Sequence, residues 1–458
     1  MAVFQNNLLA GAGAQSGTTT HTIDQSIRFN DGDSAYMYRT PSSASNRDKW
    51  TWSGWIKRGN ISANLQMFSA PLGSSSGYMS IQYDSSDSFM LYQWTGSGYD
   101  FDVRTTQVFR DPSAWYHYVV VYDSGNAIST ERVKLYVNGQ RITSFSTASY
   151  PSQNTDSYIN NTVQHSIGYY TRPPSAGGQY FDGYMAEIVF LDGTATDCNS
   201  FAEFNSNGIW VPKDVSGLTF GTNGFHIDGR DSADLGDDES GQGNDYTASG
   251  LAAHDQVLDS PTNNFCVMNP LNKHSNVVLS NGNLHALNSG TSIAYPSAAT
   301  ILLPSSGKWY AEIKIINRIT PHEYPMTGVF NNSVRTLITS SNNPGSSDVT
   351  GAKDIGFGAD TRRLENGTNT SSWGSALDDG NIAAIAIDMD NIKIWWGHNQ
   401  TGSFVWSASG NPNTGANPAN TIEFNTTELV FGNGHYSSSE CHWNFGHCLL
   451  YTSPSPRD

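Results

Sequence analysis

The sequence is poor in cysteine, in charged residues and in long apolar runs, and each shortage excludes a class of protein. Four cysteines occur in 458 residues, far apart and without a C-x-x-C pair: Cys198, Cys266, Cys441 and Cys448. This spacing supports neither a zinc site nor a dense disulfide framework. No apolar stretch approaches the roughly 20 residues of a membrane-spanning helix. We therefore expect no metal site and no membrane insertion.

Basic residues are also scarce. Lysine and arginine number 24 against 41 aspartates and glutamates, which gives a formal net charge of −17. That charge opposes a phosphate backbone, so we expect nucleic acid and anionic membranes not to be ligands. The 44 glycines and 12% aromatic residues accompany many serines, threonines and asparagines, and no stretch sustains the i, i+3, i+4 spacing of a capped helix. This composition is typical of an all-β protein with many loops.

One hairpin pattern occurs twice in the chain. In the first half, residues 115–123 form an apolar run closed by an aspartate, and apolar residues then fall at every second position of residues 132–139. In the second half, residues 381–388 and 391–397 repeat the arrangement. Period two places those apolar side chains on one face of a strand, which needs a second sheet to cover it. The Asn-Gly pair that ends the first copy suits a tight turn. The chain is therefore predicted to form two β-sandwiches in series.

The first half carries a specific set of strand motifs in a fixed order. They are Trp-Ser-Gly-Trp-Ile at 52–56, the run at 115–123, Val-Lys-Leu-Tyr-Val-Asn-Gly at 133–139, and Phe-Asp-Gly-Tyr-Met-Ala-Glu-Ile at 181–188. Together they resemble a laminin-G-like, concanavalin A-type jelly roll that covers residues 23–197. The resemblance implies two curved antiparallel sheets, with a glycan or protein site carried on loops.

Residues 302–447 resemble a second kind of sandwich, the SPRY domain. The order of the apolar segments at 307–315, 354–358 and 379–396 matches that family. The sequence departs from the family pattern at 396–402, where Gly-His replaces the usual small polar residues before Asn-Gly. SPRY domains are recognition modules, so the resemblance adds binding and not catalysis. The predicted fold class is thus all-β, with two concanavalin A-like antiparallel β-sandwiches joined by a loop-rich connector.

Residues 198–301 are expected to form that connector. Their densest acidic stretch, residues 228–245, lacks the acidic spacing and the closing glutamate of an EF-hand loop. We expect no cofactor, although the stretch leaves room for a structural calcium ion as the alternative to a solvated turn. Residues 255–265 and 268–271 resemble the connector of predicted tail or appendage proteins of marine tailed phages, as does the opening at residues 4–9.

Both ends of the chain are expected to lie outside the folded domains. Residues 1–22 lack the basic region and apolar core of a secretion signal, so we expect a flexible N-terminus. Residues 448–458 can be back-translated into a string that resembles the end of a transposase-type sequencing adapter. On this interpretation the natural chain is cut at His447 and the SPRY-like sandwich is truncated; the alternative is an ordinary tail rich in proline and serine.

Glycoside hydrolases occur among concanavalin A-type sandwiches, so we ask whether the sequence contains a catalytic pair of carboxylates. A retaining glycosidase needs two carboxylates about 5 Å apart. Glu187 and Asp192, the nearest pair, are five residues apart and would point to opposite faces of a strand. The sequence has no Gly-x-Ser-x-Gly elbow and no His-Glu-x-x-His motif, and we expect His117 to pack in the sheet rather than to bind a ligand. We therefore expect no catalytic residues and no enzyme.

Aromatic residues in loops are the best sequence signal for ligand binding, because sugars stack on flat apolar rings. Tyr99 in Gly-Ser-Gly-Tyr-Asp-Phe, and Tyr169, Tyr170 and Arg172 in Tyr-Tyr-Thr-Arg, are the candidates. The alternative for each of them is ordinary packing at the end of a strand.

These observations leave three functional hypotheses. The first is a non-enzymatic phage virion component, in the tail or an appendage, that binds host-surface carbohydrate or protein and contacts other virion proteins. The second is a secreted, extracellular bacterial protein that binds polysaccharide or is related to glucanases, with its catalytic part absent. The third is a structural spacer without a ligand, because a jelly roll can serve as an assembly unit. The missing carboxylate pair favours the first, and tail appendages imply a homo-oligomer by resemblance.

Overall fold

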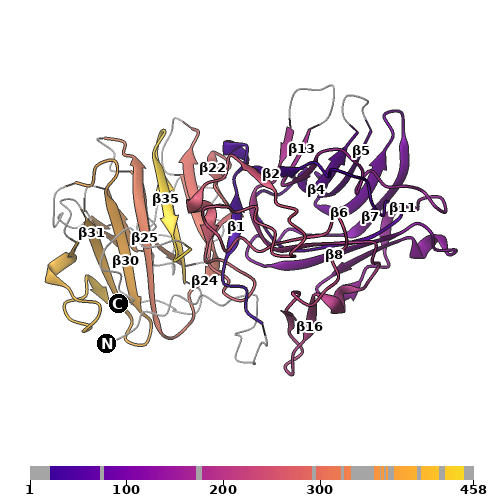
Figure 1. Ribbon diagram of the computed structural model, residues 1–458. Helices are drawn as coiled ribbons and strands as arrows, with labels where there is room; N and C mark the ends of the chain where they lie inside the picture. The colour runs from indigo at the N-terminus through magenta and orange to yellow at the C-terminus, as the bar shows by residue number, and fades with distance from the viewer. Residues whose placement is uncertain are drawn as a thin grey trace. The chain divides into compact units, whose positions relative to one another are not determined.

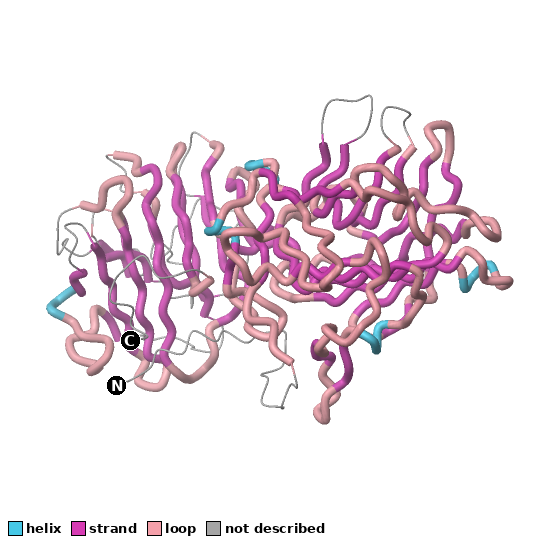
Figure 2. The backbone as a smooth tube through the Cα atoms, in the orientation of Figure 1, coloured by secondary structure: helices cyan, strands magenta, loops and turns pink. Residues whose placement is uncertain are grey.

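The described part of the protein is built from strands and loops, and its helices are short single turns. The computed structural model describes residues 21–72, 77–171, 178–290, 295–320, 324–331, 355–359, 361, 363–365, 368–369, 376–399, 404–421 and 429–447. Figure 2 shows strands throughout, with helix confined to brief turns. Those turns are 3₁₀ helices: η1 (Asp31–Asp33), η3 (Ser129–Glu131), η4 (Cys198–Ser200), η5 (Ala253–Asp255) and η7 (Ser407–Ser409). None of the described helices has the length and apolarity needed to cross a membrane.

The described residues divide into two compact units, one that ends at Asn264 and one that begins at Phe265. The first unit, which we call the first sandwich, holds two large antiparallel sheets (Figure 1). One sheet has the order β10-β9-β8-β3-β15-β1-β20, with β18 also paired to β15. Its strands are β1 (Ser26–Phe29), β3 (Lys49–Arg58), β8 (Tyr116–Asp123), β9 (Val133–Val137), β10 (Gln140–Arg141), β15 (Gly183–Asp192), β18 (Phe225–Ile227) and β20 (Gln256–Val257).

The opposing sheet of the first sandwich has the order β11-β7-β6-β5-β4-β12-β2-β19. Its strands are β2 (Tyr36–Arg39), β4 (Leu65–Pro71), β5 (Tyr78–Tyr83), β6 (Ser88–Trp94), β7 (Tyr99–Val108), β11 (Phe145–Ser149), β12 (His165–Ile167) and β19 (Thr247–Ser249). Two small hairpins lie outside both sheets: β13 (Tyr169–Thr171) with β14 (Gly178–Tyr180), and β16 (Ala202–Phe204) with β17 (Trp210–Pro212).

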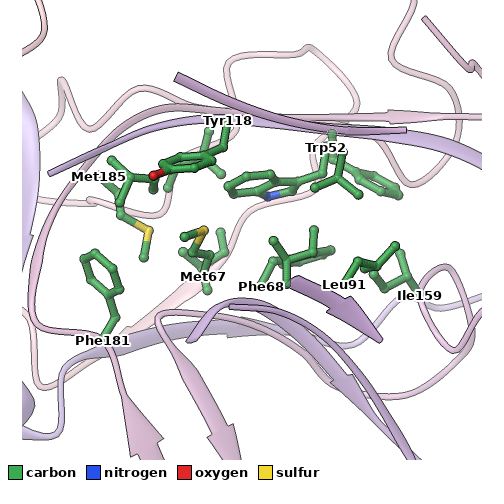
Figure 3. Packing of buried hydrophobic residues seen from close by; sticks show 14 of the residues in the cluster. Trp52, Met67, Phe68, Leu91, Tyr118, Ile159, Phe181 and Met185 are labelled. Atoms are coloured by element: carbon green, nitrogen blue, oxygen red, sulfur yellow. The ribbon is translucent and has the colours of Figure 1, made fainter. Parts of the chain in front are cut away.

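The core of the first sandwich lies between its two sheets. Figure 3 shows Trp52, Tyr118 and Met185 from one sheet facing Phe68 and Leu91 from the other. The predicted hairpin is present, because β8 pairs antiparallel with β9, and the burial of β9 alternates between buried and half-buried positions as its sequence pattern requires. Asn138 and Gly139 both have positive φ in the turn that leads to β10, as the Asn-Gly pair predicts.

The second unit, the second sandwich, again holds two antiparallel sheets. They have the orders β21-β24-β34-β26-β27-β28-β29 and β22-β23-β35-β25-β30-β31-β32, with β33 also paired to β31. The first of these sheets contains β21 (Met268–Lys273), β24 (Tyr295–Leu302), β26 (Met326–Asn331), β27 (Ile355–Gly358), β28 (Arg363–Glu365), β29 (Thr368–Asn369) and β34 (Leu429–His435). The other contains β22 (Val277–Ser280), β23 (His285–Asn288), β25 (Lys308–Asn317), β30 (Ile382–Asp388), β31 (Lys393–Asn399), β32 (Phe404–Trp406), β33 (Asn420–Thr421) and β35 (Glu440–Asn444). The second predicted hairpin is β30 with β31.

The range 198–301, predicted to be a connector, differs in the structure from that description. Residues up to 264 add β18, β19 and β20 to the first sandwich, and residues from 265 add β21 to β24 to the second. Five of these seven strands have only two to four residues, which is too few to show a periodic pattern in a sequence. The predicted flexible segment 1–22 falls outside the described residues except for residues 21 and 22, and residues 448–458 fall outside them entirely.

Candidate functional site

The sheet that contains β4 to β7 has one face toward the core and one face away from it, which we call the outer face. Along β5, the side chains of Met79, Ile81 and Tyr83 belong to the core cluster. Since successive side chains of a strand point to opposite faces, the alternate residues Tyr78 and Ser80 lie on the outer face. The outer face thus alternates with the core, although Tyr78 and Ser80 are themselves buried.

A network of amide side chains fixes the middle of the outer face. Gln66 Nε2 donates to Gln82 Oε1 at 2.5 Å, and the Tyr92 hydroxyl donates to the same oxygen at 3.1 Å. Ser80 Oγ donates to Gln66 Oε1. Gln66 Nε2 also donates to Gln179 Oε1 of β14 at 2.7 Å, which ties the β13–β14 hairpin to the face. Gln66 and Gln82 are buried, so this network fastens the hairpin to the sheet and does not face solvent.

The β13–β14 hairpin divides the outer face into two sides. Tyr170 faces Tyr78 of β5, with ring centroids 4.3 Å apart. Tyr169, the next residue along β13, points the opposite way and stacks on Tyr180 at 4.6 Å and against Tyr36 of β2 at 4.5 Å. Figure 1 shows β13 beside β2, β4 and β5. The sequence candidates Tyr169 and Tyr170 are therefore neighbours in the chain but belong to different sides.

Tyr99, at the start of β7, is the most exposed aromatic side chain of the outer face, with 53% of its surface accessible. Its ring meets Trp94 at 5.0 Å and Tyr92 at 5.7 Å, with interplanar angles of 77° and 75°. These edge-to-face contacts hold the ring in place while leaving a flat surface open. We call Tyr99, Trp94, Tyr92 and their neighbours on this side of the hairpin the Tyr99 side.

The four predicted binding residues differ in how much of each side chain a ligand could reach. Tyr99 presents an open ring, and Tyr169 is half-buried on the other side of the hairpin. Tyr170 has 2% of its surface accessible and acts as packing beneath the hairpin rather than as a platform. Arg172 lies outside the described residues. Of the predicted residues, Tyr99 is thus the one whose ring is open enough for a sugar to stack on it.

Three charged residues of the outer face escaped the sequence prediction. Arg104 of β7 donates from Nη1 to Asp84 Oδ2 at 3.2 Å and from Nη2 to Asp102 Oδ2 at 2.9 Å. Burial raises the pKa of Asp102, and the charge and hydrogen bond of Arg104 oppose that rise in pKa. The signal was present in the alternation of Asp100, Asp102 and Arg104 with apolar residues, but the sequence does not say which face of the strand is open.

A serine and a histidine on the opposite sheet are in contact but are not set up for nucleophilic catalysis. His117 Nε2 lies 2.8 Å from Ser53 Oγ, and Trp210 Nε1 donates to His117 Nδ1 at 3.1 Å. Because an indole can only donate, Nδ1 is unprotonated and Nε2 carries the hydrogen. Burial also lowers the pKa of His117 to about 3. The imidazole therefore donates to Ser53 and has no free nitrogen to take its proton.

Glu187 and Asp192 have separate sets of partners. Glu187 sits at a bulge of β15 with φ of 47° and accepts a hydrogen bond from His226 Nε2 at 2.9 Å. Asp192 accepts from Asn160 Nδ2 at 2.9 Å and from the backbone N–H of Asn223 at 3.0 Å. Each carboxylate therefore has a local structural role.

The acidic stretch 228–245 uses its carboxylates to cap turns. Asp228 and Asp231 each accept from the backbone N–H two residues ahead, at 2.9 and 2.8 Å. Asp238 accepts from the N–H groups of His226, Ser240 and Asn244 at 2.8 to 2.9 Å. The bonds to the residue two ahead are Asx turns, and the bonds from His226 and Asn244 fasten the loop to its neighbours, so these carboxylates order the loop through backbone N–H groups. Among the described residues, no group of three histidine, cysteine or acidic side chains is arranged to hold a metal ion.

Comparison with known protein families finds a match within the first sandwich. Residues 31–198 match the concanavalin A-like lectin/glucanases superfamily in its laminin G form, which confirms the predicted laminin-G-like fold for that part of the chain. The all-β fold class with antiparallel sandwiches is likewise confirmed. A search of curated proteins found no match.

Solved structures to which this chain is similar include three of different origin. The SPRY domain of human HERC1 is 16% identical, with a TM-score of 0.28, and the match covers 40% of this chain and 98% of that one. Domains LG4-5 of the mouse laminin alpha1 chain are 10% identical, with a TM-score of 0.31 and coverage of 95% and 90%. Domain 4 of the arabinanase AbnA from Geobacillus stearothermophilus, solved with arabinotriose, is 19% identical, with a TM-score of 0.25 and coverage of 33% and 64%. The SPRY resemblance of residues 302–447 stays a prediction.

Proposed function

We propose that the first sandwich is a non-enzymatic carbohydrate-binding module and that its sugar stacks on the Tyr99 side of the outer face. The observation that carries the proposal is the Tyr99 ring, 53% exposed and braced edge-on by Trp94 and Tyr92, with the fixed Arg104 guanidinium on the same strand. A flat ring next to fixed hydrogen-bonding groups is the combination that sugar recognition requires. The superfamily match of residues 31–198 supports the same ligand class.

In the fuller form of this proposal, the chain is a component of a phage tail or appendage, in the virion and outside the host cell. Its ligand is then a glycan of the host surface, and other virion proteins hold it in the particle. The phrases at residues 4–9, 255–265 and 268–271 support this setting by resemblance. The net charge of −17 supports a ligand other than nucleic acid or an anionic membrane.

Replacing Tyr99 by alanine is expected to weaken glycan binding at least tenfold, about 1.4 kcal/mol, because the stacking surface is removed. The melting temperature should hardly change, since the side chain is largely exposed. A glycan array identifies the ligand for the full chain, and calorimetric titration then measures the affinity of each variant. The matched control is Phe204→Ala, which removes another aromatic ring, 49% exposed, from the β16–β17 hairpin. Equal affinity of Tyr99→Ala and the unchanged chain would refute the site, and the absence of any glycan ligand would refute the function.

A further inference from the structure

The charges of the Tyr99 side are already paired with one another. Arg104 is the cation of this surface among the described residues of β5 to β7 and their turns. Its Nη1 donates to the carboxylate of Asp84, and its Nη2 donates to the carboxylate of Asp102. One guanidinium thus stands between two carboxylates, and the local charge is negative like that of the whole chain.

Two buried polar atoms at the same place have no hydrogen-bond partner. They are Asp102 Oδ1, an acceptor, and Arg104 Nε, a donor. The two residues are two apart on β7, so their side chains lie side by side on the outer face. The Asp102 side chain is only 7% exposed, which means that water does not readily supply the missing bond. An unpaired acceptor beside an unpaired donor calls for a group that can both donate and accept.

We infer that the ligand of the Tyr99 side is a neutral, hydroxyl-rich sugar rather than a sulfated or uronic-acid glycan. This inference rests on the proposed function and specifies its ligand. A sugar hydroxyl can donate to Asp102 Oδ1 and accept from Arg104 Nε, whereas a sulfate or carboxylate group can only accept. An anionic group would leave Asp102 unpaired and would add negative charge next to Asp84 and Asp102. It would also find Arg104 already engaged by two carboxylates.

Both unpaired atoms lie just below the surface, so a hydroxyl reaches them only when a side chain moves aside. The long Arg104 side chain is 28% exposed. A shift of its guanidinium would open both atoms to a sugar hydroxyl, while the Tyr99 ring keeps its contacts with Trp94 and Tyr92 and stacks on the same sugar.

The test compares neutral polymers with anionic forms of the same backbone, using the full chain. The probes are dextran and dextran sulfate, galactan and sulfated galactan, and methyl-esterified and free polygalacturonate. We expect the neutral member of at least one pair to bind at least tenfold more tightly, with less than a twofold change in affinity between 50 and 500 mM NaCl. Tighter binding of the anionic member would overturn the inference and keep the proposed function. The absence of binding to all six would count against the proposed function itself.

A double substitution, Asp84→Asn with Asp102→Asn, sharpens the test by releasing Arg104. This variant is expected to gain at least tenfold in affinity for the sulfated probe, a gain that shrinks as salt rises, and to lose affinity for the neutral probe. The control removes two other arginine-paired carboxylates, Asp156→Asn with Glu131→Gln, and should leave both affinities unchanged. A similar gain in affinity for the sulfated probe in the control would mean that the lower net negative charge causes the gain, and not the release of Arg104. If the double variant does not fold, the comparison of probes on the unchanged chain still decides the inference.

Discussion

Replacing Asp259 by asparagine is expected to lower the free energy of unfolding of the first sandwich by about 3–5 kcal/mol, the usual cost of breaking a buried ion pair. Lys57 Nζ lies 2.7 Å from Asp259 Oδ2, and both side chains are fully buried, with 0% of their surface accessible. Asp259 Oδ1 also accepts from Trp115 Nε1 at 2.8 Å. The substitution removes the negative charge that lies 2.7 Å from the Lys57 ammonium group, while Asn264 Oδ1 still accepts from that group at 2.8 Å.

Hydrogen exchange measured by mass spectrometry on the full chain can follow this loss in the first sandwich alone. Peptides that cover β3 and β15 should exchange through global unfolding and report the change directly. The matched control is Asp156→Asn, whose carboxylate is 60% exposed and pairs with Arg47 at 3.1 Å. Exposed pairs contribute about 0–1 kcal/mol, so the control should be nearly neutral. A loss below about 1 kcal/mol for Asp259→Asn would show that the Lys57 ammonium group does not need this partner.

The position of Asp259 also shows where sequence reasoning reached its limit. The β8–β9 and β30–β31 hairpins were predictable because each carries its period-two pattern within a short stretch. Strand β20 has two residues and pairs with β1, more than two hundred residues away. Neither its length nor its surroundings gives a periodic signal. The stretch around Asp259 therefore looked like a loop, although it completes the first sandwich.

The candidate site was predictable to a similar extent. An aromatic residue within a glycine- and serine-rich turn pointed to Tyr99, and the structure exposes that ring. Tyr169 and Tyr170 were predicted together, but adjacent residues of a strand point in opposite directions, so the hairpin buries one of them against Tyr78. Which of the two is buried depends on where the hairpin packs. Asp102 and Arg104 were missed for a related reason, since their pairing depends on which face of β7 is open.

Replacing Glu187 by glutamine is the second substitution with a large expected effect, and this effect should depend on pH. Burial alone would raise the pKa of Glu187, but the hydrogen bond from His226 and the neighbouring His21, whose Nε2 lies 3.9 Å from Glu187 Oε1, outweigh it and lower that pKa to about 2. The nearby Glu187 carboxylate raises the pKa of His21. Burial lowers the pKa of His226, but Glu187 outweighs burial and the net change is a rise. Asp228 adds to the rise for His226, Asp214 adds to it for His21, and Arg230 opposes it for both.

The sign of the pH dependence follows from these directions. The carboxylate of Glu187 stabilises the fold above its usual pKa of 4.5, and this contribution is lost as pH falls toward about 2. The histidines stabilise the fold fully below their usual pKa of 6.5, and their contribution is lost as pH rises through their raised folded-state pKa values. The cluster is therefore most stabilising between about pH 4.5 and 6.5. A fall in pKa from 4.5 to about 2 corresponds to about 3 kcal/mol.

Glu187→Gln should consequently cost about 3 kcal/mol near pH 5.5 and clearly less near pH 9, where the histidines are neutral in either form. Urea unfolding at pH 5.5, 7 and 9, followed by hydrogen exchange in β15, measures this difference. The control is Asp214→Asn, a fully exposed carboxylate near His21. It should leave the pH profile almost unchanged, because water and salt screen its charge. A loss for Glu187→Gln that is the same at pH 5.5 and pH 9 would mean that the side chain contributes packing at its bulge, and that its charge does not hold the two histidines. A loss that shrinks toward pH 9 would identify the Glu187 charge as the link between β15, His21 and His226 of β18.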